Sequence, residues 1–210
     1  MAGFAVRLRL YQQEGNKLME MISSKRQEKA MKNIATVALM LNLGVAGIYA
    51  QQRSVNMTFS GTSANSTINL QQPGTSNSED NSAGNGTLGP FTFRNVRAIP
   101  NAPQPSSSCS GPTKIHFLSV VGSGVFHFQD GSLLTVNLIQ GDDCIDFAAP
   151  VAHCTMTFRI TGGTGRFTGA SGTLTLTEAV VVVLADAFNN PVFFAATGEF
   201  TGTVSGGAMH

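Results

Sequence analysis

The chain has 210 residues, of which only 12% are charged, and it contains 23 glycines and no tryptophan. This length suits one domain with extensions or two small domains, and the low charge with many short β-rich segments favours a β-sandwich or barrel over a helical enzyme. Residues 51–210 carry six Lys/Arg against nine Asp/Glu, so this part lacks the basic surface that nucleic acid requires, and no nucleic-acid partner is expected.

The first 50 residues are predicted to precede the folded domain. Residues 1–30 are polar and of mixed charge, and Met31 offers a second start, so 1–30 is interpreted as an extension from a mis-assigned start. Lys32 then precedes an apolar run that ends with a small residue, Ala50, at the cleavage position, the pattern of a secretory signal over 31–50. A single-pass anchor is the alternative, although the run is shorter than the roughly 20 residues that such a helix needs. The protein is therefore expected to be secreted, periplasmic or on the cell surface, with membrane contact only through an uncleaved signal.

Residues 51–88 are rich in Ser, Asn and Gly. One strand is expected at Ser54–Ser60, but the remainder offers few large apolar side chains to offset the entropy of ordering. The segment is therefore predicted to be a flexible linker or a long exposed loop, and the folded domain is expected to span 89–207.

Alternation with a period of two predicts strands throughout this domain. They are expected at Phe91–Ile99, Lys114–Val121, Gly124–Gln129, Ser132–Ile139, Ala152–Ile160, Gly172–Leu184 and Pro191–Val204. Asp130-Gly131 is a strong hairpin signal between two of them. Short turns throughout favour an all-β fold, a single antiparallel up-and-down β-barrel, because closure removes exposed strand edges.

The most distinctive stretch is ITGGTGRFTGASGTLTLTE at 160–178, in which glycines separate two alternating segments. These glycines are predicted to shape a kinked turn between strands: Gly162, Gly163, Gly165, Gly169 and Gly172. A phosphate loop is excluded, because no Lys follows the glycines and a Thr/Leu strand, not a helix, comes next.

The segment GGTGRFTGASGTLTLT resembles the glycine-rich hairpin of small secreted bacterial β-barrel proteins, related to the allene oxide cyclase and dirigent barrels. The resemblance implies a barrel whose interior holds an apolar guest, with a few polar side chains that steer cyclisation or radical coupling. It places none of those families' catalytic residues on this chain.

The three cysteines suggest a disulfide in an exported chain. Cys144 and Cys154 are the predicted pair, which would join two neighbouring strands, although Cys109 could replace either partner. A metal site at Cys144, His153 and Cys154 is disfavoured, because adjacent strand residues point to opposite faces. No metal and no cofactor are predicted.

The acidic run over 141–146 contains Asp142, Asp143 and Asp146. Its spacing does not fit a calcium-binding loop of the EF-hand type. An exposed acidic turn is therefore expected, and a weak ion site at the surface is the alternative.

Glu178 continues the buried phase of Leu174 and Leu176, so its carboxylate is expected inside the barrel. A buried carboxylate needs a partner or a raised pKa, and it can act as a general acid or base or hold the polar end of a ligand. His116 shares the phase of Leu118 and is a second candidate for an inward-facing catalytic group. A bulge that returns Glu178 to solvent is the structural alternative.

The interior of the barrel is predicted to be apolar. Its expected lining is Phe126, Phe128, Leu134, Val136, Leu138, Met156, Phe158, Leu174, Leu176, Phe194 and Phe200. The ligand-binding residues are expected to be Phe126, Phe128, Met156, Phe158, Leu174, Leu176 and Glu178. The leading hypothesis is an exported, non-enzymatic module that binds a small hydrophobic molecule or a surface partner. The alternatives are a cyclase or isomerase that uses Glu178, and a structural protein of the cell surface or matrix.

Overall fold

The computed structural model describes residues 52–66, 73–105, 109, 115–146 and 151–206. The extension, start and signal predicted for 1–50 lie outside these residues. The elements are β1 (Arg53–Ser66), β2 (Thr75–Gly86), β3 (Phe91–Pro100), β4 (Gln104–Pro105), β5 (Ile115–Ser119), β6 (Val121–Phe128), β7 (Leu133–Asp146), β8 (Val151–Gly163), the 3-10 turn η1 (Gly165–Phe167), β9 (Ser171–Ala185) and β10 (Pro191–Ser205). Within the described part of the chain, no helix has the length and apolar character needed to span a bilayer.

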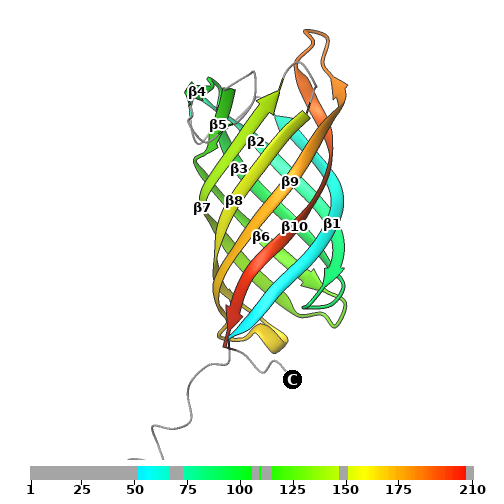
Figure 1. Cartoon of the computed structure of the whole chain (residues 1–210), viewed down its shortest axis with the longest axis vertical. Coiled ribbons are helices and arrows are strands. Elements are labelled where there is room, and N and C mark those ends of the chain that lie inside the picture. Colours follow the sequence, from blue (N-terminus) through cyan, green and yellow to red (C-terminus); the bar gives the residue numbers. More distant parts are fainter. Residues whose placement is uncertain (1–51, 67–72, 106–108, 110–114, 147–150, 207–210) are drawn as a thin grey trace, which may run out of the picture. The chain divides into compact units, whose positions relative to one another are not determined.

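The sheet closes on itself. Its strand order is β4-β5-β7-β6-β3-β2-β1-β10-β9-β8, and an additional pairing of β7 with β8 joins the two sides. β5 and β6 pair with successive halves of the same edge of β7, so together they occupy one strand position in the barrel wall. The result is an antiparallel barrel, as predicted, and it has eight strand positions. Its tilted strands wrap around a common interior (Figure 1).

The prediction of a linker over 51–88 is wrong, because β1 and β2 occupy most of this segment and form two strands of the barrel. Strand β2 escapes a search for apolar alternation because its inner face is polar. Ser78, Asp80 and Ser82 are buried, whereas the residues that follow each of them are exposed. Buried and exposed positions do alternate in β2, but the buried positions carry polar side chains, and these face a polar part of the barrel interior.

The acidic turn predicted at 141–146 is also wrong, because this segment is the second half of β7. A bulge between Leu138 and Gln140 shifts the register with β8, and Asp143 then faces inward. Buried carboxylates are tolerated in a strand when they are paired, and Asp143 is paired, as described below.

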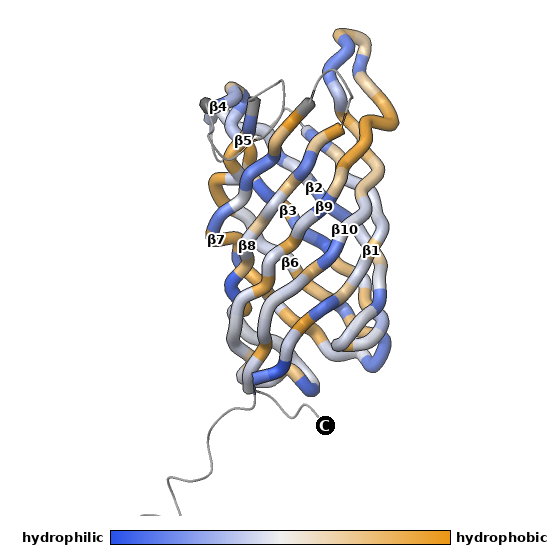
Figure 2. Tube along the Cα trace, viewed as in Figure 1, coloured by the Kyte–Doolittle hydropathy of each residue, from blue (hydrophilic) through white to orange (hydrophobic). Residues whose placement is uncertain are grey.

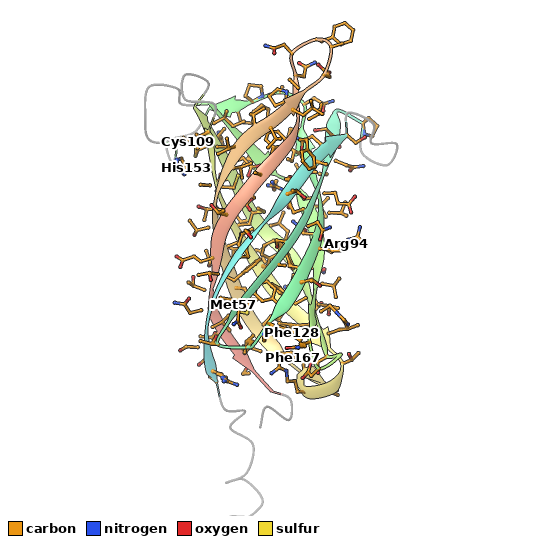
Figure 3. All side chains as sticks on the ribbon, turned by 90° about the vertical axis from the view of Figure 1, so that its right-hand side faces the viewer. Met57, Arg94, Cys109, Phe128, His153 and Phe167 are labelled. Atoms are coloured by element: carbon orange, nitrogen blue, oxygen red, sulfur yellow. A yellow bond between two sulfur atoms is a disulfide. The ribbon has the colours of Figure 1, made fainter. Side chains whose placement is uncertain are left out.

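One end of the barrel is closed by the glycine-rich stretch, and we call it the plug end. Gly162, Gly165, Gly169 and Gly172 have positive φ values of 145°, 58°, 75° and 138°, as a kinked turn between strands requires. The turn folds Phe167 inward, where it is fully buried against Phe128 at the plug end (Figure 3). Arg166 stacks on both rings and pairs with Asp130 at 3.1 Å, which seals this end.

Candidate functional site

The half of the interior nearer the plug end is a solid layer of aromatic rings, which we call the aromatic layer. Its members are Phe59, Phe91, Phe93, Phe126, Phe128, Phe158 and Phe200. Neighbouring ring centroids are 4.3 Å apart for Phe93 and Phe126 and 4.9 Å apart for Phe126 and Phe200. Such separations are those of packed aromatic pairs, so the rings themselves fill this level of the barrel.

Beyond the aromatic layer, the interior becomes charged. We call this set the polar layer: Asp80, Asn95, Arg97, Asp143, Cys154 and Glu178, with Ser63, Ser78, Ser82 and Ser119 around them. All of these residues are buried. They come from seven strands, β1, β2, β3, β5, β7, β8 and β9, so only the closed barrel brings them together.

Arg97 is the centre of the polar layer. Its Nη1 donates to both carboxylate oxygens of Asp143, at 2.9 and 2.8 Å, and to Ser119 Oγ at 3.0 Å. Its Nε lies 3.4 Å from Asp80 Oδ2. Burial opposes the arginine's positive charge, but Asp143 and Asp80 outweigh that penalty and hold its pKa well above the ordinary value.

Glu178 lies opposite Cys154 on the neighbouring strand and is only 5% exposed. Burial, together with the charge of Asp80, raises the pKa of Glu178 to about 8, although Arg97 opposes the shift. Glu178 is therefore mainly protonated at neutral pH. Its Oε1 is buried without a hydrogen-bond partner, as is Oδ1 of Asp80. The inward orientation expected for Glu178 is thus the one observed.

A small cavity of about 10 Å³ lies between the two layers, which is room for roughly one water molecule. Its polar side is formed by Asp80, Ser82 and Glu178, and its apolar side by Phe59, Phe93, Leu176, Ala196 and Phe200. The two unpartnered carboxyl oxygens thus belong to residues that line one cavity. Such a site favours an occupant that carries a polar group on an apolar body.

Beyond the polar layer, toward the end that carries the β9–β10 hairpin, the interior becomes apolar again. We call this the apolar collar: Ile99, Val180, Val182 and Phe194. Ile99 and Val180 are buried, whereas Phe194 and Val182, which pair across β9 and β10, are half-buried. The collar therefore places apolar surface between the cavity and the hairpin end.

The predicted ligand-binding residues separate into two groups. Phe126, Phe128, Phe158, Met156 and Leu174 are fully buried within packed core. Leu176 and Glu178 line the cavity. The other predicted lining residues also face the interior, with Leu138 and Phe194 only partly buried.

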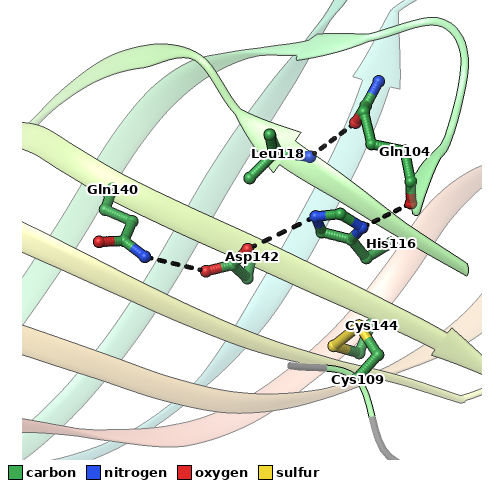
Figure 4. The surroundings of a disulfide bond; sticks show 7 residues. All are labelled: Gln104, Cys109, His116, Leu118, Gln140, Asp142 and Cys144. Carbon is green, nitrogen blue, oxygen red and sulfur yellow. Dashed lines mark hydrogen bonds and ion pairs between the residues drawn. A yellow bond between two sulfur atoms is a disulfide. The ribbon is translucent and has the colours of Figure 1, made fainter. Parts of the chain in front are cut away.

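His116 does not face the interior, so the orientation predicted for it is wrong. It shares the outer face of the wall with Asp142 and Cys144, where it is buried beside Gln104 of β4 (Figure 4). Its Nδ1 is 2.6 Å from the carbonyl oxygen of Gln104, and its Nε2 is 3.7 Å from Asp142 Oδ1. His116 and Glu178 therefore lie on opposite faces of the wall. The contact of the histidine with Gln104 holds β4 beside β5.

The disulfide predicted between Cys144 and Cys154 is wrong as well. Cys144 is bonded to Cys109 (Figure 4). Cys154 is a buried free thiol. Asp143, not Cys144, is the register partner of Cys154, so the two cysteines point to opposite faces of the wall. Burial, with Asp143 and Glu178 nearby, raises the pKa of the Cys154 thiol well above its ordinary value.

The β9–β10 hairpin extends beyond the other described strands and is rich in hydrophobic residues (Figure 2). We call this the apolar hairpin surface: Val181, Val183, Leu184, Phe188 and Phe193. Phe188 at the turn is 85% exposed. The turn is ordered around Asp186, whose carboxylate accepts hydrogen bonds from the backbone of Phe188 and Asn190.

Sequence reasoning missed Asp80, Asn95, Arg97 and Asp143 as site residues. A signal for Arg97 was present, because it lies in phase with Phe91 and Phe93 in a predicted strand. An arginine on that face requires buried carboxylates from other strands. No periodicity in the sequence identifies those partners. Among the described residues, no group of three or more His, Cys, Asp or Glu side chains is arranged to hold a metal ion.

Comparison with solved structures finds a match to the pterocarpan synthase dirigent protein. The two share 11% identity over 77% of this chain and 88% of that one, with a TM-score of 0.39. No protein-family model and no curated protein sequence matches the chain. The assignment of a closed antiparallel barrel therefore rests on the strand pairing of this chain itself.

Proposed function

We propose that this protein is an exported binding module that holds a small molecule inside the barrel. The polar group of the ligand contacts Glu178 and Asp80, and its apolar body extends through the apolar collar toward the hairpin end. The observation that carries this proposal is that two buried carboxyl oxygens without partners belong to residues lining one cavity. Unpartnered buried polar atoms cost stability, and a ligand that satisfies them recovers that cost.

The arrangement of charge supports a binding role. Replacing buried ion pairs by packed apolar residues is often neutral or stabilising, so the polar layer is a poor way to stabilise a barrel. Export is supported by the Cys109–Cys144 disulfide, because such bonds persist in oxidising compartments.

The test is a titration of the full chain with a neutral apolar fluorophore, N-phenyl-1-naphthylamine. We expect a saturable rise in fluorescence at about one probe per barrel. Ala196 lines the cavity, so Ala196→Leu should weaken binding by about tenfold or more, since extra methyl groups overpack the site. Its matched control is Ala195→Leu, on the exposed face of the same strand. Absence of saturable binding, or equal binding by both variants, contradicts the proposal.

A second candidate is an enzyme of the cyclase or isomerase kind, favoured by the protonated state of Glu178. A carboxylic acid with a pKa of about 8 beside a cavity can donate a proton at neutral pH. The measurement is mass spectrometry and NMR of apolar molecules after incubation with the protein. A product of unchanged mass and altered structure, absent with Glu178→Gln, supports catalysis. Recovery of every molecule unaltered supports a binding module.

A further inference from the structure

The charges of the polar layer do not balance. Among its described residues, Arg97 is the only cation, and it is engaged by Asp143 and by Oδ2 of Asp80. Glu178 has no cation of its own, and Oδ1 of Asp80 faces no donor. The layer thus contains three carboxyl groups and one guanidinium.

The unpartnered atoms also share one chemical character. Asp80 Oδ1, Asn95 Oδ1 and Glu178 Oε1 are oxygens without a hydrogen-bond donor. The fourth unpartnered atom of this layer, Arg97 Nε, already faces Asp80 at 3.4 Å. A ligand that satisfies this layer must therefore supply donors, and positive charge would complement it.

We infer that the polar group recognised by this cavity is a primary ammonium, carried on an apolar body. This inference rests on the proposed binding function and names its ligand class. An ammonium has three donors, whereas a hydroxyl has one. Its size is close to that of the water for which the cavity has room, so a trimethylated ammonium is too large.

Binding of such a cation releases a proton. The neutral Glu178 carboxyl loses its proton to solvent, and the carboxylate then pairs with the ammonium, which keeps all its hydrogens. The groups that face Glu178 from the packed strands are Asp80 on β2, Arg97 on β3, Asp143 on β7 and Cys154 on β8. On the β10 side its partner is Gly198, which has no side chain.

The experiment displaces N-phenyl-1-naphthylamine from the full chain at pH 7 with four six-carbon compounds: hexylamine, hexanol, hexanoate and hexyltrimethylammonium. Hexylamine should bind at least about tenfold more tightly than the others, because charge-assisted hydrogen bonds are roughly twice as strong as neutral ones. Glu178→Gln should remove most of this preference, and Glu199→Gln, on the exposed face of β10, should keep it. Asp80→Asn provides a second variant and should also reduce the preference.

Isothermal titration in two buffers of different ionisation enthalpy measures the proton. Hexylamine should release close to one proton per barrel at pH 6.5 and almost none above about pH 9. Equal affinity for amine and alcohol, equal affinity for the primary and trimethylated amines, or an unchanged preference in Glu178→Gln overturns the ammonium assignment alone. If the fluorophore itself does not bind, the proposed function fails and the assignment fails with it.

Discussion

Arg97 and Asp143, 46 residues apart in the chain, form an ion pair inside the barrel, in which Nη1 contacts both carboxylate oxygens. The contact joins β3 to β7 and is almost completely shielded from water, because the Arg97 side chain is only 4% exposed. Loss of the arginine would leave two buried carboxylates without a cation. The polar layer therefore depends on this residue more than on any other.

Arg97→Met should lower the free energy of unfolding by about 3–5 kcal/mol, the cost of breaking a buried ion pair from one side. The matched control is Arg94→Met on the same strand, because Arg94 pairs with Glu79 at the surface and its side chain is 66% exposed. That change should cost no more than about 1 kcal/mol. Urea denaturation of both variants measures the difference, and equal costs would contradict the described layer.

Glu178 should make the protein less stable as pH rises. The folded state retains the proton up to about pH 8, whereas the unfolded chain releases it near 4.5. The free energy of unfolding should therefore fall by up to about 1.4 kcal/mol per pH unit between these values, apart from other titrating groups. In Glu178→Gln this slope should be reduced, and in Glu199→Gln it should persist. Denaturation from pH 5 to 8 decides, and identical slopes in both variants would refute the raised pKa.

The cysteines should behave differently from one another. Cys109→Ala opens a disulfide that closes a separation of 35 residues, so it should cost about 2–4 kcal/mol. Cys154→Ala should leave the disulfide intact. Thiol labelling of the wild type should find Cys154 unreactive in the folded state and reactive after unfolding without reductant, because its thiol is buried with a raised pKa. Peptide mapping that joins Cys144 to Cys154 would contradict the structure.

The apolar hairpin surface should govern attachment to hydrophobic surfaces. Phe188→Ser should shorten retention on a phenyl column and reduce concentration-dependent association, since exposed apolar patches mark interaction sites. Stability should change by less than about 0.5 kcal/mol, because the ring makes little contact with the core. Ala187→Ser in the same turn is the control. Unchanged retention in Phe188→Ser would show that this surface does not interact.

The sequence allowed most of the wall to be predicted from Phe91 onward, because apolar side chains alternate there with polar ones. The same rule failed in β2, where Ser78 and Asp80 occupy the buried positions. Glu178 was found because it continues an apolar phase in β9. Its companion Asp143 was not, since a bulge after Leu138 changes the phase of β7 and no local pattern reports which strands face each other.

The most direct measurement of the central claim is an NMR titration of methyl-labelled protein with hexylamine. The account predicts chemical-shift changes at the methyl groups of Leu176 and Ala196, which line the cavity beside Glu178. It predicts no change at Leu134 and Val136, which are buried in the core but do not line this cavity. Shifts confined to Leu134 and Val136, or no shifts at saturating amine, would contradict a ligand site at the polar layer.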